Sequence, residues 1–166
     1  MKILGIDPGY AILGYGIVEM RESRFSLCDY GALTTAAGTA LPDRLKSLYA
    51  ALMEIIARHE PDAASVEELF FNSNAKTALL VGQARGAALL ACVNSGLRIY
   101  EYTPLQIKQG LTGYGRADKT QMQAMVRTIL HLDETPRPDD AADALAAAIC
   151  HGHSAAYRAR MEGFAK

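Results

Sequence analysis

The sequence lacks tryptophan, has only three cysteines among its 166 residues, and carries a formal net charge of only −1. Because positive and negative charges nearly balance, any contact with nucleic acid has to rely on a local positive patch. The cysteines are odd in number and widely spaced, which argues against a disulfide framework and against a cysteine metal site. These features favour a reducing compartment, and we expect a cytoplasmic protein.

Long apolar segments are missing as well. The apolar run between Lys2 and Asp7 is too short for a signal peptide, and we expect none. The most apolar stretch, residues 77–93, is interrupted by Gln83 and Arg85 and does not predict a membrane span. Half of the residues are hydrophobic, so a chain of this length can bury a core. We expect one domain over residues 1–153 and a flexible C-terminal tail over residues 154–166.

Hydrophobic periodicity indicates an α/β fold. It predicts strands at residues 3–6, 12–19, 24–33, 63–67 and 98–102. It predicts helices at residues 45–56, 73–95, 104–112, 119–130 and 139–151, with Gly152 just past the end of the last helix. Consecutive strands early in the chain favour antiparallel pairing, whereas the later alternation of strand and helix favours parallel pairing. We therefore expect a mixed sheet covered by helices on both faces.

The predicted helix over residues 73–95 has small residues on several faces, among them Ala84, Gly86 and Ala88. A helix that is apolar nearly all round must be covered on more than one side. It is either sandwiched inside the domain, or it packs on the core with one face and on a second subunit with another. The sequence leaves both arrangements open.

Acidic residues stand where three of the predicted elements begin or end. Asp7 ends the first strand, where a Pro-Gly turn stops it. Glu67 and Glu68 end the fourth strand, and the alternation of side chains lets only one of them face the same side as Asp7. Asp140 and Asp143 lie three residues apart at the start of the last helix, and this spacing places them on one face.

Carboxylates gathered in one place repel one another, and a divalent cation removes that repulsion. Oxygen ligands favour Mg²⁺ or Mn²⁺ over zinc. Such sites often hold two ions roughly 3.5–4 Å apart, which clamp a phosphodiester and activate water. Each acid also has an ordinary structural explanation, as a turn residue or as a complement to a helix dipole. The acids therefore predict a metal site only if the fold brings them together.

Four sequence blocks occur in the order typical of one known family. They are IDPG at 6–9, VEELF at 66–70, GQARG at 82–86 and DAADAL at 140–145. On these blocks the sequence resembles the RuvC family of bacterial Holliday junction resolvases over roughly residues 2–153. The resemblance implies a ribonuclease H-like fold with a five-stranded mixed sheet. It also implies a homodimer that cuts opposing strands of a four-way DNA junction during recombination and repair, with Mg²⁺ or Mn²⁺, two ions per site, and with the branch-migration proteins RuvA and RuvB as partners.

By matching position, the resemblance assigns the metal-binding, catalytic carboxylates to Asp7, Glu67, Asp140 and Asp143. It thereby chooses Glu67 over Glu68. Hydrolysis at such a site needs no covalent enzyme intermediate.

The resemblance also implies that Lys108 and Lys119 lie near the scissile phosphate, with Lys119 as a catalytic residue. The segment 104–127 carries four positive residues against Asp118, which gives a local charge of +3 suited to phosphate contacts. Further expected DNA contacts are Arg85, Arg116, Phe70 and Phe71. One phenylalanine is expected to stack on an unpaired base near the junction centre and the other to fill the core.

Other functions also fit parts of the pattern. A related ribonuclease H-like enzyme acting on RNA or on a hybrid shares the strand-end carboxylates, and a catalytically silent junction-binding protein shares the DNA contacts. An actin-like ATPase can also end its first strand in Gly-Ile-Asp, but it needs two large lobes, for which 166 residues are too few.

Overall fold

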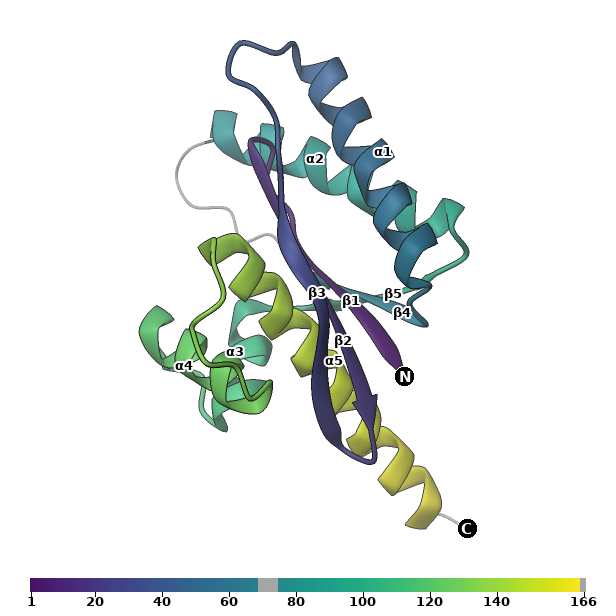
Figure 1. Cartoon of the computed structure of the whole chain (residues 1–166), viewed down its shortest axis with the longest axis vertical. Helices are drawn as coiled ribbons and strands as arrows, with labels where there is room; N and C mark the ends of the chain where they lie inside the picture. The colour runs from purple at the N-terminus through teal and green to yellow at the C-terminus, as the bar shows by residue number, and fades with distance from the viewer. Residues whose placement is uncertain (69–74, 165–166) are drawn as a thin grey trace.

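The computed structural model describes residues 1–68 and 75–164. The elements, in chain order, are β1 (Lys2–Asp7), β2 (Ile12–Arg21), β3 (Arg24–Thr34), α1 (Leu41–His59), β4 (Ala63–Glu67), α2 (Ala75–Asn94), β5 (Arg98–Tyr102), α3 (Pro104–Thr112), α4 (Lys119–Ile129) and α5 (Asp139–Phe164). Figure 1 shows their arrangement, with both termini towards the same end of the molecule.

The strands form one sheet in the order β3-β2-β1-β4-β5. β1 pairs antiparallel with β2, and β2 pairs antiparallel with β3. β4 pairs parallel with β1 on one side and with β5 on the other. The predicted mixed sheet of five strands is therefore confirmed, and β1 lies at its centre.

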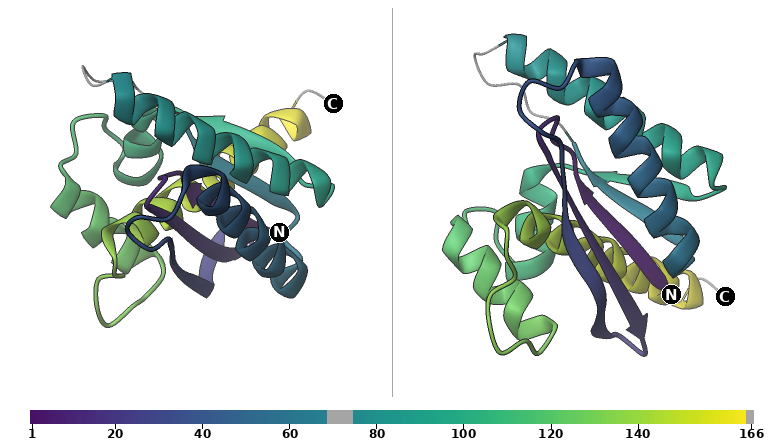
Figure 2. Two further views of the ribbon diagram at one scale, coloured as in Figure 1. Left: turned by 90° about the horizontal axis from the view of Figure 1, so that it is seen from above. Right: turned by 45° about the horizontal axis from the view of Figure 1, so that its top comes forward.

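Helices cover both faces of the sheet, as predicted (Figure 2). α1 and α2 pack against one another on one face, above a core that includes Leu4 and Ile6 of β1. α5 crosses the other face, with α3 and α4 beside it, above a core that includes Ile3. Because successive side chains of a strand point to opposite faces, Ile3, Gly5 and Asp7 all belong to the α5 face.

α5 approaches the sheet very closely because β1 and β2 present glycines beneath it. A Cβ atom added to Gly5 would overlap the backbone carbonyl of Ala144, and one added to Gly14 would overlap that of Asp140. Ser65 of β4 donates its hydroxyl to the carbonyl oxygen of Ala147 at 2.6 Å. The position of the first turns of α5 over β1 and β2 is thus fixed by backbone-to-backbone contact.

The starts of α3 and α4 match the sequence prediction. Thr103 and Gln106 form a capping box at α3, and Asp118 and Gln121 form a second at α4. These boxes satisfy backbone N–H groups that would otherwise lack partners at the helix ends.

The predicted end of the last helix is wrong. α5 does not stop at His151 but continues to Phe164, and its final turns extend beyond the sheet (Figure 1). Gly152 lies inside this helix and does not end it. A Cβ atom at Gly152 would overlap the ring of Phe25. The glycine therefore allows close packing inside a continuous helix. The division of the chain at residue 153 stays a prediction, although the helix crosses that boundary.

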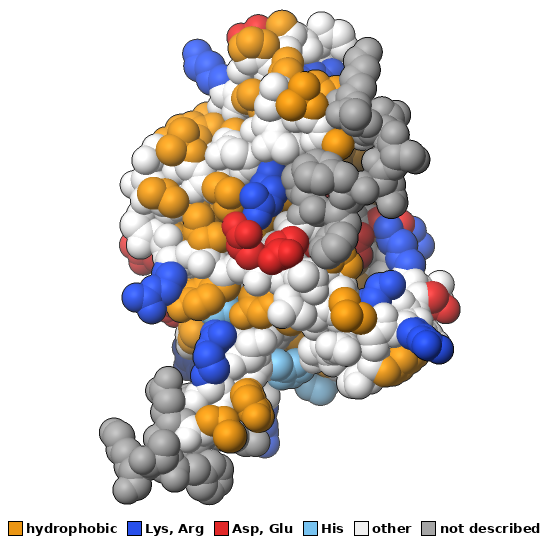
Figure 3. All heavy atoms as spheres, turned by 180° about the vertical axis from the view of Figure 1, so that it is seen from behind, with side chains coloured by type: hydrophobic (Ala, Val, Ile, Leu, Met, Phe, Trp, Pro, Cys, Tyr) orange, Lys and Arg blue, Asp and Glu red, His pale blue; other side chains and the backbone are white. Residues whose placement is uncertain are grey.

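α2 leaves much of its surface uncovered. Ala84, Ala88 and Ala91 are buried, whereas Leu79, Leu90 and Val93 are 65%, 53% and 60% exposed. Figure 3, which views the molecule from behind, shows hydrophobic side chains on the surface where α2 lies. In the described part of the chain, only the span Thr77–Asn94 is long and apolar enough to cross a membrane; one such helix is weak evidence, because core helices pass the same test.

Candidate functional site

Asp7 and Glu67 lie next to one another at the ends of adjacent parallel strands. Ile6 of β1 is aligned with Val66 of β4, so each strand ends in its acid one residue later. Val66 belongs to the core under α1 and α2, whereas Ser65 bonds to α5. Alternation therefore directs Glu67 to the α5 face, where Asp7 also points. Of the two glutamates, only Glu67 is therefore directed to the same face as Asp7.

The first turns of α5 bring Asp140 and Asp143 to the same place. The backbone of Asp140 lies directly over Gly14, which is paired with Asp7 in the sheet. Asp7 is close enough to Glu67, Asp140 and Asp143 for all three charges to act on it. We refer to Asp7, Glu67, Asp140 and Asp143 as the carboxylate cluster.

The electrostatic effect on Asp7 is large. Burial, followed by repulsion from Glu67, Asp143 and Asp140, raises its pKa from 3.8 to about 7. Burial is the leading cause because a charged carboxylate loses its hydration when it is enclosed by β1, β2 and α5.

The pKa values of two neighbouring acids are displaced in the same direction. Burial also raises the pKa of Glu67, and repulsion from Asp143 adds to it. The pKa of Asp143 is raised by burial in spite of the opposing charge of Lys119. A site in which several neighbouring carboxylates have raised pKa values is suited to bind a cation.

Lys119 forms an ion pair with one acid of the cluster. Its Nζ atom lies 3.1 Å from Oδ2 of Asp139 and 3.5 Å from Oδ2 of Asp143. Partial burial acts to lower the pKa of Lys119, but hydrogen bonds to Asp139 and the charge of Asp143 raise it overall. The ammonium therefore stays charged at the rim of the cluster.

A cavity of about 200 Å³ opens beside the cluster. Glu67, Asp143, Lys108 and Lys119 supply its polar wall. Its apolar wall comes from α3, α4 and α5 through Pro104, Ile107, Met122 and Ala146. Two acids and two lysines thus line one cavity, which can accept an anionic group with an apolar attachment.

The donor set fits divalent cations that prefer oxygen, because the cluster contains only carboxylates. The side chains are nevertheless not drawn into a closed ligand shell. Within residues 1–68 and 75–164, no group of three acidic, histidine or cysteine side chains stands close enough to hold a metal ion as it is. A cation would have to pull the carboxylates together against the repulsion that raises the pKa of Asp7, and to displace Lys119 from Asp143.

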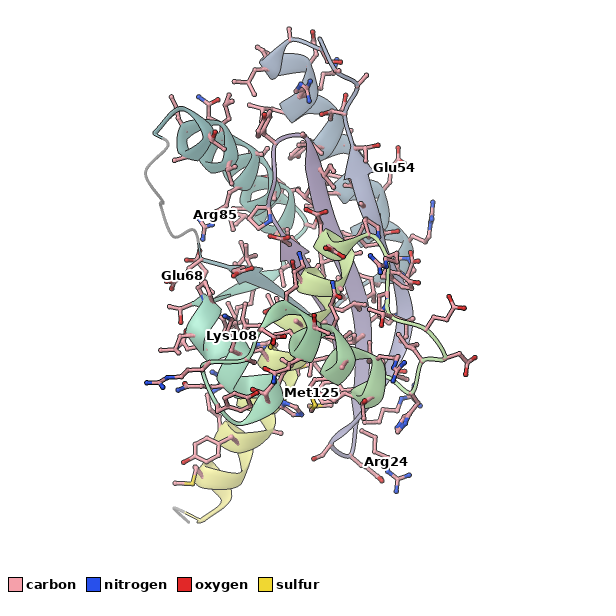
Figure 4. The ribbon with its side chains drawn as sticks, turned by 90° about the vertical axis from the view of Figure 1, so that its left-hand side faces the viewer. Arg24, Glu54, Glu68, Arg85, Lys108 and Met125 are labelled. Carbon is pink, nitrogen blue, oxygen red and sulfur yellow. The ribbon has the colours of Figure 1, made fainter. Side chains whose placement is uncertain are left out.

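Other predicted site residues are placed differently. Arg85 lies on α2 and Lys108 on α3, on opposite sides of the sheet (Figure 4). The guanidinium of Arg85 forms a 2.7 Å ion pair with Glu101 of β5, and the side chain is only 18% exposed. Arg85 is therefore held away from the carboxylate cluster. Arg116 is exposed between α3 and α4. Phe70 and Phe71 lie outside the described residues.

Sequence reasoning missed Asp139. Its carboxylate binds Lys119 and also accepts a hydrogen bond of 2.9 Å from Nε2 of Gln123. The available signal was the run of two aspartates at the start of α5, which is equally typical of any helix start. The apolar residues that line the cavity carried no recognisable signal, because they continue the ordinary core pattern of their helices.

Comparison with protein families gives one consistent result. The family model described as crossover junction endodeoxyribonuclease RuvC matches residues 3–151. A protein of that name from Alkaliphilus oremlandii is 60% identical over 154 residues, which are 93% of this chain and 94% of the relative. Another from Caldanaerobacter subterraneus is 56% identical, over 93% of each chain.

Solved structures agree with the sequence comparison. The structure of T. thermophilus RuvC in complex with a Holliday junction substrate is 36% identical in sequence, with a TM-score of 0.87 over 95% of this chain and 96% of that one. The yeast mitochondrial Holliday junction resolvase superposes with a TM-score of 0.70 at 12% identity, over 98% of this chain and 83% of that one, and so shares the fold.

Proposed function

Because this chain belongs to the RuvC family of crossover junction endodeoxyribonucleases, we propose that the carboxylate cluster cuts four-way DNA junctions by phosphodiester hydrolysis. The observation that carries this proposal is the gathering of four carboxylates at one end of the sheet, from the ends of β1 and β4 and from the first turns of α5, where burial and three acidic neighbours raise the pKa of Asp7 to about 7. Such crowding of acids is unfavourable without a bound cation, and a divalent cation would relieve it.

RuvC nucleases depend on divalent metal ions in general. For this chain the ions are Mg²⁺ or Mn²⁺, two per site, held by Asp7, Glu67, Asp140 and Asp143. When bound, they neutralise the acids, polarise the scissile phosphate and lower the pKa of coordinated water. The strand ends hold Asp7 and Glu67 with little freedom, and the close packing of α5 on β1 and β2 fixes Asp140 and Asp143 opposite them.

The lysines attract the phosphate. Lys108 and Lys119 border the cavity beside the cluster, so a phosphodiester placed there meets their positive charge next to the acids. Lys119 offsets the charge that develops on the phosphate during hydrolysis. The apolar wall of the cavity accommodates the sugar or base next to the cut. Arg116 contributes a further DNA contact, and one of Phe70 and Phe71 stacks on an unpaired base near the junction centre.

The active form is a homodimer in which α2 packs against α2 of the second subunit. The exposed apolar side chains Leu79, Leu90 and Val93 support this assignment, as does the open space around Gly82 and Gly86. Two subunits supply two clusters, which paired cuts in opposing strands require. The protein acts in the cytoplasm, together with the branch-migration proteins RuvA and RuvB.

The test of the cluster is Asp7→Asn in an assay on a synthetic four-way junction. Junction binding should survive, whereas cleavage with Mg²⁺ should fall by at least about a hundredfold. Asp133→Asn, on the exposed loop before α5, is the matched control and should cleave as the wild type does. Undiminished cleavage by Asp7→Asn would remove the cluster from the mechanism.

The same assay separates the other functions. Preference for RNA or for a hybrid over the junction would indicate a related ribonuclease H-like enzyme. Tight junction binding without cleavage by the pure wild type at any Mg²⁺ or Mn²⁺ concentration would indicate a silent junction-binding protein. For the dimer, Leu90→Glu should shift sedimentation equilibrium towards the monomer, while Leu105→Glu on α3 should not.

A further inference from the structure

The ammonium of Lys119 is shared between two carboxylates of α5 that lie one helical turn apart. Nζ lies 3.1 Å from Asp139 and 3.5 Å from Asp143. Residues four apart on a helix are neighbours on one face. The ammonium of Lys119 can therefore pass from one of these carboxylates to the other by moving less than the length of one helical turn. Asp143 belongs to the carboxylate cluster and its charge acts on Asp7, whereas Asp139 stands outside the cluster.

Asp139 is held in place independently of Lys119. Its Oδ1 atom accepts a 2.9 Å hydrogen bond from Gln123 and lies 3.5 Å from the guanidinium of Arg137. Gln123 lies four residues after Lys119 on α4, so both side chains project from the same face of that helix. Asp139 therefore ties the first two turns of α4 to the first turn of α5 through two contacts, from Lys119 and from Gln123.

We infer that Asp139 is a positioning residue that takes over the ammonium of Lys119 when a divalent cation occupies Asp143. This inference rests on the proposed metal-dependent function of the cluster. In the metal-free protein the ammonium partly neutralises Asp143. A divalent cation at Asp143 repels the ammonium, and Asp139 provides a second anionic partner within reach. Lys119 then stays beside the cavity, where the scissile phosphate binds, and is not released into solvent.

The inference predicts how metal affinity depends on Asp139. In Asp139→Asn, Asp143 is the only carboxylate among the described residues that still forms an ion pair with Lys119. An entering cation must then break that pair without replacement. Because Lys119 is 55% and Asp143 is 35% exposed, the effect is modest, and the Kd for Mn²⁺ should rise about two- to fivefold. Lys119→Met removes the competitor for Asp143 and should lower the Kd by a similar factor.

The experiment is calorimetric titration of the full chain with Mn²⁺ in the absence of DNA. The decisive sample is the double variant Lys119→Met with Asp139→Asn, which should bind Mn²⁺ as Lys119→Met alone does. If Asp139 acted through its charge alone, its substitution would weaken binding equally with and without the lysine. If Asp139 were itself a metal ligand, the loss would exceed tenfold in both backgrounds. Either of these results overturns the inference.

Two further variants complete the design. Glu134→Gln removes one negative charge from the exposed loop that leads into α5 and should leave the Kd unchanged. Gln123→Ala loosens Asp139 without changing charge and should shift the Kd in the same direction as Asp139→Asn, by a smaller factor. Failure of the wild type to bind Mn²⁺ would instead refute the proposed metal site, whereas wild-type binding that Asp139→Asn does not change refutes only the role of Asp139.

Discussion

Replacing Asp7 with asparagine should make the metal-free protein more stable while it abolishes cleavage. Asparagine has nearly the same shape as aspartate but never ionises. Asp7 is enclosed by β1, β2 and α5 and faces three other acids, so its charged form is unfavourable in the folded chain. The substitution removes that unfavourable charge from the end of the central strand.

The magnitude follows from the pKa of Asp7, which is about 7 in the folded protein against an ordinary value of 3.8. Between these pH values the folded chain keeps a proton that the unfolded chain has released, so the wild type loses stability as the pH rises. Above pH 7 the full penalty is about 4 kcal/mol. Relaxation of neighbouring side chains reduces it, and we expect Asp7→Asn to gain about 2–4 kcal/mol at pH 8.

The measurement is urea denaturation in the presence of a chelator at pH 8 and at pH 5. Most of the penalty develops between these pH values, so the gain from Asp7→Asn should fall by more than half at pH 5. Asp133→Asn is the control, with a change within about 0.5 kcal/mol at both pH values. Adding Mg²⁺ should reverse the order at pH 8, because only the wild type keeps its full ligand set. A variant that is less stable than the wild type at pH 8, or a gain independent of pH, would refute the electrostatic account of the cluster.

Three packing predictions follow from α5. Gly5→Ala should destabilise the protein by about 3 kcal/mol or more in urea denaturation, since the new methyl group would overlap the backbone carbonyl of Ala144. Gly152→Ala should cost about 1–3 kcal/mol because it would overlap the ring of Phe25, whereas at an uncrowded helix position alanine would be stabilising. Tyr102→Phe removes the buried 2.8 Å hydrogen bond to Nδ1 of His151 and should cost about 1–3 kcal/mol by the same measurement, with junction cleavage by the folded variant unchanged.

Much of the fold could be predicted from local patterns. Most helices were located because they pack one apolar side against the sheet, which produces a clear period in the sequence, and the central strands β1 and β4 because they are short apolar runs buried on both faces. The starts of α3 and α4 were identified by capping boxes, which depend only on residues three apart. The end of α5 was not predictable in this way, because the role of Gly152 depends on Phe25, more than a hundred positions away in the chain.

The candidate site was predictable in its members but not in its geometry. Residue patterns left Glu67 and Glu68 equal, and the family resemblance chose Glu67. The structure gives the physical reason for their difference, since Ser65 and Glu67 share the face that α5 covers. Asp139 was overlooked because its importance lies in the contacts with Lys119 and Gln123, which no spacing within α5 can indicate.

The glycines beneath α5 and the acids of the carboxylate cluster act together. Four carboxylates do not gather unaided, because each raises the free energy of the others, as the pKa of Asp7 records. The packing of α5 on the sheet supplies the free energy that offsets this repulsion. α5 lies so close to β1 and β2 that only glycine fits beneath Ala144 and Asp140. That packing holds the repelling acids at one end of the sheet before any cation arrives. A chain that kept the acids but carried alanine at Gly5 would separate α5 from the sheet, and it would lose its metal affinity together with its stability.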